Sequence, residues 1–302
     1  MGQPLALGHP ARGGRRPRWA LLLCAGLAAC SVLLAGCATG SPKAPAKLAL
    51  VIGNAAYENV IPLKNPTNDA DDMCAALQKL GFKTLCHTNV RDRAEFDARV
   101  KEYVDQLGEN SVGVFYYSGH GVQAGNANYL IPTQVLIRSA TENPMHALYA
   151  VDDLFGRLGQ KKTRFQFVAL DACRADLFSP PPRAAARSTL VRALEKVGGA
   201  GNGFQPITHA PPGTMVLFAT ASKDTAYDGD GRNGTLTKHM LENIGTRALT
   251  IESFVKLVTL GVELETLQKF RKRQTPYTYG SFTGKFCFAG CDITVPPVPP
   301  AN

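Results

Sequence analysis

Short, mostly apolar runs that alternate with stretches of helical periodicity constrain the fold of this 302-residue chain more than any other feature. We interpret the runs as strands, because a strand buried on both faces of a parallel sheet is apolar over its whole length. The predicted strands lie at 48–52, 82–86, 112–117, 165–170, 215–220 and 285–288.

Apolar residues spaced three and four positions apart predict helices between these runs. In the first helix, Asn68 is a candidate N-cap and Gly81 a candidate stop. The predicted helices lie at 70–80, 96–107, 235–245 and 251–272. Strands that alternate with helices indicate an α/β fold with a mainly parallel sheet, whose binding sites lie at the carboxyl ends of the strands.

The first 36 residues have the composition of an export signal. Arginines between Arg12 and Arg18 precede 17 uncharged residues, and the run ends in Leu34-Ala35-Gly36-Cys37. This ending resembles the lipobox of bacterial lipoproteins. The resemblance implies cleavage before Cys37, lipidation of its sulfur and a membrane-anchored, extracytoplasmic domain. Ala38 then favours the outer membrane, facing the periplasm. The alternative is an uncleaved anchor helix at the lower length limit for spanning a bilayer.

The charge balance gives little support for a nucleic-acid partner. The formal net charge is +9, and loss of the four arginines in the signal segment lowers it to +5. Basic and aromatic residues are not interleaved as in binders of single-stranded nucleic acid. We therefore predict no nucleic-acid partner.

Two predicted strands end in residues that carry chemistry. The strand at 112–117 leads into Ser118-Gly119-His120-Gly121, and that at 165–170 into Asp171-Ala172-Cys173-Arg174. A nucleophilic cysteine needs a nearby imidazole to take its proton. Taken singly, Cys173 could be an inert buried thiol and His120 a turn residue. As a spaced pair at two strand ends, they favour catalysis.

These motifs resemble those of the caspase–metacaspase clan of cysteine peptidases, in which the histidine lies about 50 residues before the cysteine. The resemblance covers 47–290, and its matching segments are 48–54, 63–70, 117–121, 170–174 and 218–221. It implies a caspase-like fold. It also implies that the protein hydrolyses peptide bonds in protein or peptide substrates without a cofactor. Cys173 would attack the carbonyl, His120 would act as base and acid, and the amides of Gly121 and Cys173 would form the oxyanion hole.

Three further residues are candidates for the substrate pocket. Alternate residues of a strand share a face, so Asp171 should point with Cys173, and Ser118 with His120. A carboxylate beside the nucleophile favours Arg or Lys in the substrate. Metacaspases, which cleave after Arg or Lys, carry aspartates that match Asp69 and Asp171. Asp69 could instead stabilise a helix start through the macrodipole.

Two departures from the metacaspase pattern limit the resemblance. Arg174-Ala175-Asp176 replaces the usual His-Ser-Gly after the cysteine, which favours the broader bacterial caspase-like group with its less uniform specificity. Calcium is not expected, because 122–134 holds no acidic residue and the loop at 228–234 fails the EF-hand pattern at Arg232 and Asn233. No Cys/His spacing suggests zinc.

The resemblance divides the chain into several parts. A signal at 1–36 and a spacer with the lipidated cysteine at 37–47 precede a peptidase domain at 48–290, whose small-subunit-like part is 214–290, and a Pro-rich tail at 291–302. The Pro- and Gly-rich stretch at 178–213 is expected to be a structureless linker. It offers a basic-specific peptidase the self-cleavage sites Arg183, Arg187, Arg192 and Lys196, unless it is only a solvated loop.

The cysteine count agrees with export. Five cysteines remain after the signal and Cys37, and an odd number leaves one free thiol, which chemistry assigns to Cys173. The other four allow three pairings, of which Cys74–Cys86 and Cys287–Cys291 join nearest neighbours. The main alternative to a peptidase is a non-proteolytic caspase-fold scaffold at the cell envelope. The sequence predicts no oligomeric state.

Overall fold

The computed structural model describes residues 46–173, 188–197, 204, 207, 209–220, 231–280 and 282–291, with the side chain of Cys173 left out. Every described helix and strand, and every buried apolar cluster, lies in one compact unit, Ala44–Asn302. A unit with its own hydrophobic core folds as a domain. Cys37, Arg183 and Arg187 lie outside the described residues.

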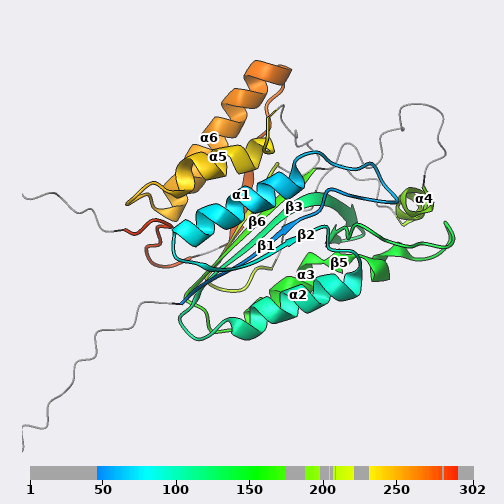
Figure 1. Ribbon diagram of the computed structural model, residues 1–302, viewed down its shortest axis with the longest axis horizontal. Coiled ribbons are helices and arrows are strands. Elements are labelled where there is room, and N and C mark those ends of the chain that lie inside the picture. Colours follow the sequence, from blue (N-terminus) through cyan, green and yellow to red (C-terminus); the bar gives the residue numbers. More distant parts are fainter. Residues whose placement is uncertain are drawn as a thin grey trace, which may run out of the picture. The chain divides into compact units, whose positions relative to one another are not determined.

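A mainly parallel sheet forms the centre of this domain and confirms the predicted α/β class (Figure 1). Its strands follow the order β2-β1-β3-β6-β7-β8, and only β8, at one edge, is antiparallel to its neighbour. The bounds are β1 (Lys47–Gly53), β2 (Lys83–Thr88), β3 (Val112–Ala124), β6 (Phe165–Cys173), β7 (Thr214–Phe218) and β8 (Tyr277–Gly280). β3 runs past the predicted end and pairs with β4 (Ala127–Leu130), which pairs with β5 (Tyr149–Ala150).

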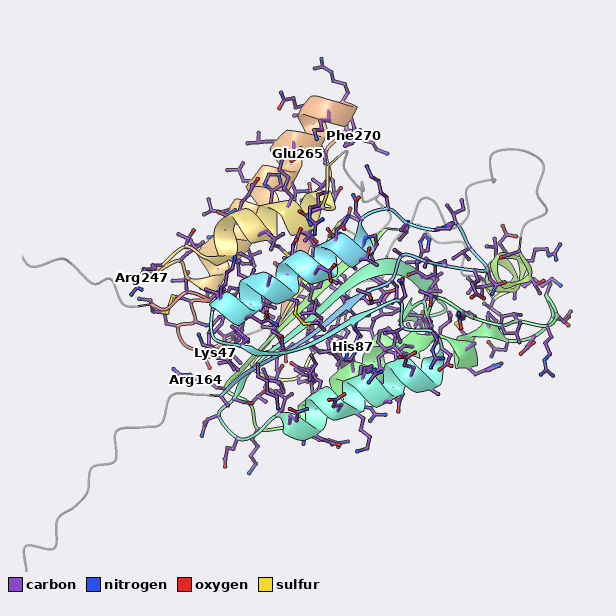
Figure 2. The ribbon with its side chains drawn as sticks, viewed as in Figure 1. Lys47, His87, Arg164, Arg247, Glu265 and Phe270 are labelled. Carbon is purple, nitrogen blue, oxygen red and sulfur yellow. A yellow bond between two sulfur atoms is a disulfide. The ribbon has the colours of Figure 1, made fainter. Side chains whose placement is uncertain are left out.

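Helices cover both faces of the sheet (Figure 1). One face carries α1 (Pro66–Lys79), α5 (Thr235–Ile244) and α6 (Ile251–Phe270), and the other carries α2 (Arg93–Gln106) and α3 (Val151–Gly159). Alternation along β3 supplies both cores: Val114 and Tyr116 pack on the α1 side, and Phe115 and Tyr117 on the α2 side. Lys47 and Arg164 lie together where β1 and β6 begin, opposite the edge where the parallel strands end (Figure 2).

The ends of α1 confirm one of the two predicted signals. Gly81 has a φ of 81°, and the N–H groups of Gly81 and Phe82 donate to the carbonyls of Gln78 and Leu77. This pattern is the Schellman stop that favours glycine. The N-cap prediction was wrong, because α1 begins at Pro66 with Asn65 as its N-cap. The fixed φ of proline suits the first helical position, so the helix starts before Asn68.

The last strand was also predicted at the wrong place. Residues 285–288 form no strand, and the chain pairs with β7 earlier, through β8. Phe286 and Phe288 are instead buried in the core beneath α1 and α6, so their apolar character serves packing. The disulfide Cys287–Cys291 closes this segment, and a second disulfide joins Cys74 of α1 to Cys86 of β2. Both are the pairings between neighbours in sequence.

The stretch expected to be structureless contains a helix, α4 (Thr189–Lys196), so that expectation was wrong in part. The Ser188 hydroxyl accepts a hydrogen bond from the N–H of Val191 and caps the helix. Leu190, Ala193 and Leu194 are buried against an apolar cluster that includes Tyr57. β4, β5, α3 and the 3-10 turn Pro144–Ala147 were not predicted from the sequence either. No described helix has both the length and the apolar character needed to cross a bilayer.

A candidate active site at the carboxyl end of the sheet

β3 and β6 bring the two predicted motifs into register. Their parallel pairing sets Ser118 beside Asp171, Gly119 beside Ala172 and His120 beside Cys173. The backbone of Cys173 closes β6, while its side chain lies outside the described part of the chain. The two strand ends therefore meet at one edge of the sheet, as the sequence predicts.

His120 is buried and held from several sides. Its ring Nε2 lies 2.7 Å from the carbonyl oxygen of Ile61, and its backbone N–H donates to the Tyr57 hydroxyl at 2.7 Å. The rings of Tyr57 and His120 lie 4.5 Å apart between centroids. Because a carbonyl oxygen can only accept, the Ile61 contact requires a proton on Nε2. In the neutral imidazole, Nδ1 is then the nitrogen that can take a proton.

Gly119 allows this close arrangement of tyrosines around His120. It has a φ of 154°, and a Cβ atom there would lie 2.7 Å from the hydroxyl oxygens of both Tyr57 and Tyr117. The Tyr117 hydroxyl donates to the His120 carbonyl at 2.8 Å. Burial raises the pKa of Tyr117 well above its usual range, which keeps this hydroxyl protonated and able to donate. A side chain at position 119 would displace these tyrosine hydroxyls from His120.

Gly121, the predicted oxyanion residue, lies where packing leaves no room for a side chain. A Cβ atom there would lie 2.4 Å from the ring of Phe204 and 3.1 Å from the Cβ of Ala172. Phe204 is buried and packs edge-on against Phe218. A residue from the expected linker therefore lies directly against the strand that carries His120.

Each of the two predicted pocket aspartates is hydrogen-bonded to a residue at the α5 start, and Ser118 is bonded to one of them. The Ser118 hydroxyl donates to Asp69 Oδ2, and the backbone N–H of Gly234 donates to Asp69 Oδ1, both at 2.9 Å. Asp171 Oδ2 accepts from the hydroxyl of Thr237 at 2.6 Å and from its N–H at 3.2 Å. A Cβ atom on Gly234 would lie 3.2 Å from a carboxylate oxygen of each aspartate, so both acids lie close to the same glycine. We call Asp69, Ser118 and Asp171 the acidic pocket.

The acidic pocket lies beside a buried tyrosine. The hydroxyl of Tyr116 hydrogen-bonds to Thr237 Oγ1 beside Asp171. Burial and the charges of Asp69 and Asp171 raise the pKa of Tyr116 well above its usual value.

A loop before α5 closes one side of the acidic pocket. The Arg232 guanidinium binds both carboxylate oxygens of Asp72 on α1, at 2.8 and 3.0 Å, and the Asn233 amide donates to the same group. The hydrogen bond from Arg232 lowers the pKa of Asp72. Asn68, expected to cap α1, instead donates its side-chain amide to the carbonyl of Arg232 at 3.2 Å.

The sequence missed the residues that support the candidate site: Ile61, Tyr57, Gly234 and Thr237. Ile61 acts through its backbone carbonyl, which any residue possesses, so no sequence signal could identify it. Gly234 and Thr237 lie at the start of a predicted helix, and helix starts supply backbone N–H groups. That was the available signal for the α5 end of the pocket.

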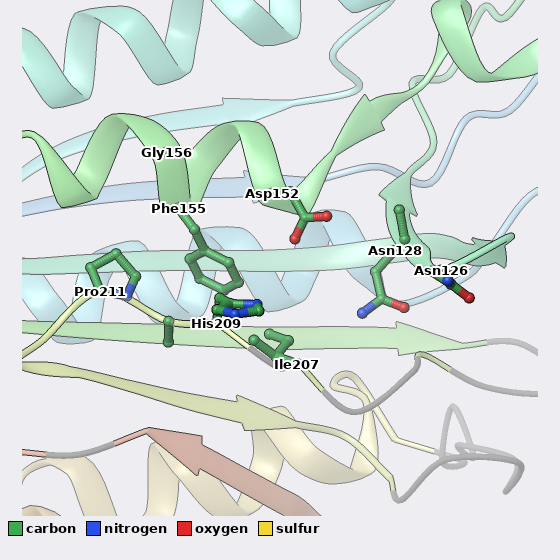
Figure 3. Close-up of a pocket in the computed structure, with 10 residues that line it drawn as sticks. Asn126, Asn128, Asp152, Phe155, Gly156, Ile207, His209 and Pro211 are labelled. Atoms are coloured by element: carbon green, nitrogen blue, oxygen red, sulfur yellow. The ribbon is translucent and has the colours of Figure 1, made fainter.

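The other predicted residues lie apart from this cluster. Arg192 and Lys196 are exposed on α4. A separate pocket of about 710 Å³ lies where α3, β4 and the segment after Phe204 meet, lined by residues that include Asn128, Asp152, Phe155 and His209 (Figure 3). None of the predicted site residues that the structure describes lines it.

The family model described as the caspase domain matches residues 46–287. Among curated proteins, the mouse homolog and the human form of mucosa-associated lymphoid tissue lymphoma translocation protein 1 are each 29% identical over 138 residues, which is 45% of this chain. The matched region spans only 16% of the length of these relatives.

Two solved structures share the fold at low sequence identity. Protein GSU0716 from Geobacter sulfurreducens has a TM-score of 0.57 and 18% identity, covering 80% of this chain and 95% of its own. Caspase-1 from Spodoptera frugiperda has a TM-score of 0.52 and 12% identity, covering 82% and 92%. At such identities the likeness concerns the fold alone.

Proposed function

Because the chain belongs to the caspase-domain family, which is a family of peptidases, we propose that it is a cysteine endopeptidase with Cys173 as nucleophile and His120 as general base. The observation that carries the proposal is the parallel register of β3 and β6, which pairs His120 with Cys173 at the carboxyl end of the sheet. Sites of α/β sheets form at this edge.

In the proposed reaction, the thiol of Cys173 gives its proton to Nδ1 of His120, and the thiolate attacks the peptide carbonyl carbon. A C–S bond forms, and the carbonyl oxygen becomes an oxyanion that the N–H groups of Gly121 and Cys173 stabilise, each by about 3–4 kcal/mol. The imidazolium then protonates the leaving amine as the C–N bond breaks, and water hydrolyses the thioester. The Ile61 carbonyl, which lies 2.7 Å from Nε2, favours the imidazolium and fixes its orientation.

The acidic pocket supports cleavage after Arg or Lys. A guanidinium can bind a carboxylate through two parallel hydrogen bonds, and an ammonium as a point charge. Asp69 and Asp171 are both buried and lie close to the same glycine, Gly234, so a basic side chain that reached them would meet two carboxylates.

The proposal extends to the lipobox cysteine and to the basic residues of the segment after Cys173. Lipidation of Cys37 would hold the peptidase at the outer membrane, facing the periplasm. Self-cleavage would occur at Arg183 or Arg187 before Arg192 or Lys196, because the last two lie in α4, which must unwind to enter an active site as an extended strand. A Cys173→Ala chain that still yields the same fragments would contradict self-cleavage.

The peptidase proposal can be tested on the unit 44–302, with fluorogenic peptides that end in Arg, Lys or Asp. We expect turnover after Arg and Lys, and none in the Cys173→Ala and His120→Ala variants. Turnover after Asp alone would contradict the acidic pocket and leave the Cys173–His120 pair intact. A folded wild-type chain that cleaves no peptide, before or after limited nicking by trypsin, would favour the non-proteolytic scaffold.

A further inference from the structure

The peptide backbone of His120 lies between two strand partners of β3. β1 pairs with β3 as far as Ser118, and β4 pairs with it from Gly121 onward. In this interval the N–H of His120 donates to the side-chain hydroxyl of Tyr57 at 2.7 Å. His120 is fully buried, and a buried N–H without an acceptor costs free energy. The Tyr57 hydroxyl therefore takes the place of a strand carbonyl.

A second tyrosine binds the carbonyl of the same residue. The Tyr117 hydroxyl lies 2.8 Å from the carbonyl oxygen of His120 and 3.2 Å from that of Ile131. A phenol has one hydrogen, and the shorter distance assigns it to His120. The Tyr57 and Tyr117 hydroxyls lie 3.2 Å apart, so the hydrogen of Tyr57 can reach the Tyr117 oxygen. Two hydroxyls thus link the N–H and the carbonyl of His120, and we call Tyr57 and Tyr117 the tyrosine pair.

Tyr57 is also held close to the imidazole itself. The two rings lie 4.5 Å apart between centroids and are tilted by 50°. Tyr57 lies between β1 and α1, in the same segment as Ile61, whose carbonyl oxygen contacts the Nε2 of His120. Its ring belongs to a buried apolar cluster that includes Leu63 and Leu190. One packed segment therefore holds His120 at its N–H, beside its ring and at Nε2.

We propose that Tyr57 is a positioning residue for His120 and that it acts together with Tyr117 through the backbone of that residue. The inference rests on the proposed function, in which Nδ1 of His120 takes the proton of Cys173. With its N–H and its carbonyl both held by the tyrosine pair, the backbone of His120 resists rotation, and the imidazole keeps one orientation toward the end of β6. Orientation matters because a displacement of about 1 Å can lower a rate on the order of 100-fold.

The test removes one hydroxyl at a time. Tyr57→Phe keeps the ring and removes the acceptor of the His120 N–H. For peptides that end in Arg we expect kcat to fall roughly tenfold and KM to stay within about twofold, because none of the bonds described for Tyr57 involves the acidic pocket. Tyr117→Phe should lower kcat to a similar extent. The double variant should lose less than the product of the two effects, since the hydroxyls act as a unit.

Tyr103→Phe is the matched control. The Tyr103 hydroxyl is buried and donates to Gln166 Oε1 at 3.0 Å, so its loss also removes a buried hydrogen bond. Gln166 is the second residue of β6, at the opposite end of the strand from Cys173. We expect this control to lower the free energy of unfolding about as much as Tyr57→Phe does and to keep the wild-type kcat. An equal fall of kcat in both variants would overturn the proposal, and so would a raised KM in Tyr57→Phe with kcat unchanged.

Amide hydrogen exchange of His120, followed by NMR of the unit 44–302 with Cys173→Ala, gives a readout that does not depend on turnover. We expect exchange roughly tenfold faster with Tyr57→Phe than with Tyr103→Phe. Equal exchange rates would overturn the positioning role even where turnover is normal. A wild-type chain that cleaves no peptide would contradict the proposed function, and the exchange rates would then still decide whether the tyrosine pair holds His120. If Tyr57→Phe does not fold, Tyr117→Phe tests the pair from the carbonyl side by the same two measurements.

Discussion

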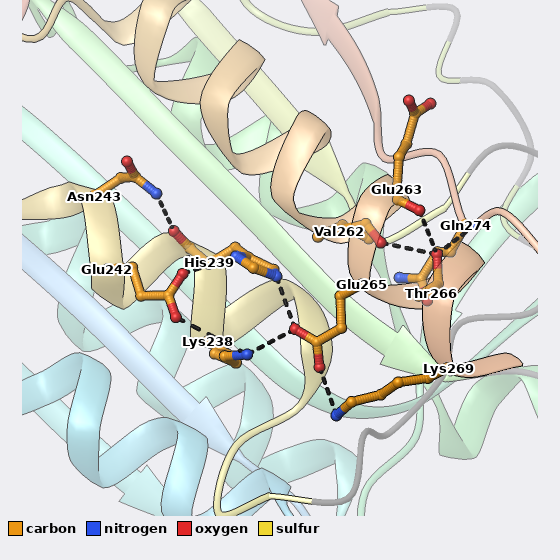
Figure 4. Close-up of polar contacts among 10 residues, drawn as sticks. All are labelled: Lys238, His239, Glu242, Asn243, Val262, Glu263, Glu265, Thr266, Lys269 and Gln274. Atoms are coloured by element: carbon orange, nitrogen blue, oxygen red, sulfur yellow. Dashed lines mark hydrogen bonds and ion pairs between the residues drawn. The ribbon is translucent and has the colours of Figure 1, made fainter.

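The carboxylate of Glu265 and those of the acidic pocket are both fixed by hydrogen bonds, but the donors differ in charge. Glu265 accepts from Lys238 and Lys269 and contacts His239, all of which are or can become cations (Figure 4). The donors that the structure shows for Asp69 and Asp171 are the hydroxyls of Ser118 and Thr237 and two backbone N–H groups.

This difference has electrostatic consequences. Burial alone would raise the pKa of Glu265, but the hydrogen bonds from Lys238 and Lys269 outweigh it and lower the pKa to about 2. The charges of the acidic pocket instead reach a neighbour, since they help to raise the pKa of Tyr116. Cationic donors therefore match the charge of Glu265 locally, whereas the donors described for Asp69 and Asp171 are neutral and fix the positions of the two carboxylates.

Removal of one pocket charge should have the largest effect. Asp171→Asn keeps an oxygen that can accept from Thr237, so the fold should be little changed. The variant loses a buried charged partner for the substrate, a change that costs about 2–5 kcal/mol in comparable pairs. We expect kcat/KM for peptides ending in Arg to fall roughly 100-fold, measured by steady-state turnover.

A matched control separates this field effect from loss of charge in general. Asp105→Asn removes a carboxylate that pairs with Lys101 on the exposed side of α2. We expect its kcat/KM to stay at the wild-type value. An Asp171→Asn enzyme as active as the control would show that the acidic pocket does not select the substrate.

The strand ends could be predicted from the sequence because apolar runs and the residues after them are local signals. The runs at 112–117 and 165–170 predict two neighbouring strands, and parallel pairing then brings His120 and Asp171 to one edge. The pleat rule predicts that Asp171 points with Cys173 and Ser118 with His120, and this stays a prediction, because the side chain of Cys173 lies outside the described part of the chain. The structure describes Ser118 bonded to Asp69 and Thr237 bonded to Asp171.

The remaining features depend on contacts between distant segments. The carbonyl of Ile61 reaches His120 only after the chain folds, and its side chain gives no sign of that role. Phe286 and Phe288 have the apolar pattern of a strand, but the core beneath α1 and α6 takes them as packing residues. The local apolar pattern cannot distinguish a strand from an irregular segment packed in the core, because both bury the same apolar side chains.

Glu265 should matter for stability rather than for catalysis. Lys238 and Lys269 are 46 and 38% exposed, so solvent screens these pairs, and Glu265→Gln should cost about 1 kcal/mol of unfolding free energy at neutral pH. Because the folded pKa of about 2 lies below the ordinary 4.5, this contribution is present above pH 4.5 and is lost as the pH falls toward 2. Denaturant unfolding across this range should show the wild-type and variant curves converging in acid.

A constant difference between the two curves at every pH would contradict this account, since it would point to packing instead of charge. Turnover provides the second measurement. We expect kcat/KM of Glu265→Gln to match that of the wild type, because none of the bonds described for Glu265 involves Asp69 or Asp171.

The smallest effect should come from the loop that borders the acidic pocket. Arg232 is 59% exposed, and an exposed ion pair with Asp72 contributes little to stability. The pair also positions Gly234, whose N–H holds Asp69. Arg232→Lys keeps the positive charge but loses the two-pronged bond to Asp72, so only the geometry changes.

We expect Arg232→Lys to raise KM for peptides ending in Arg roughly threefold, with kcat and the free energy of unfolding little changed. Arg91→Lys is the matched control, because Arg91 is a similarly exposed arginine that pairs with Glu95 on α2. If both variants keep the wild-type KM, the Arg232–Asp72 pair does not set the position of Gly234, and the amides of Asn68 and Asn233 suffice to hold the loop. A raised KM in Arg232→Lys alone would show that an exposed ion pair can tune the pocket through geometry while adding little to stability.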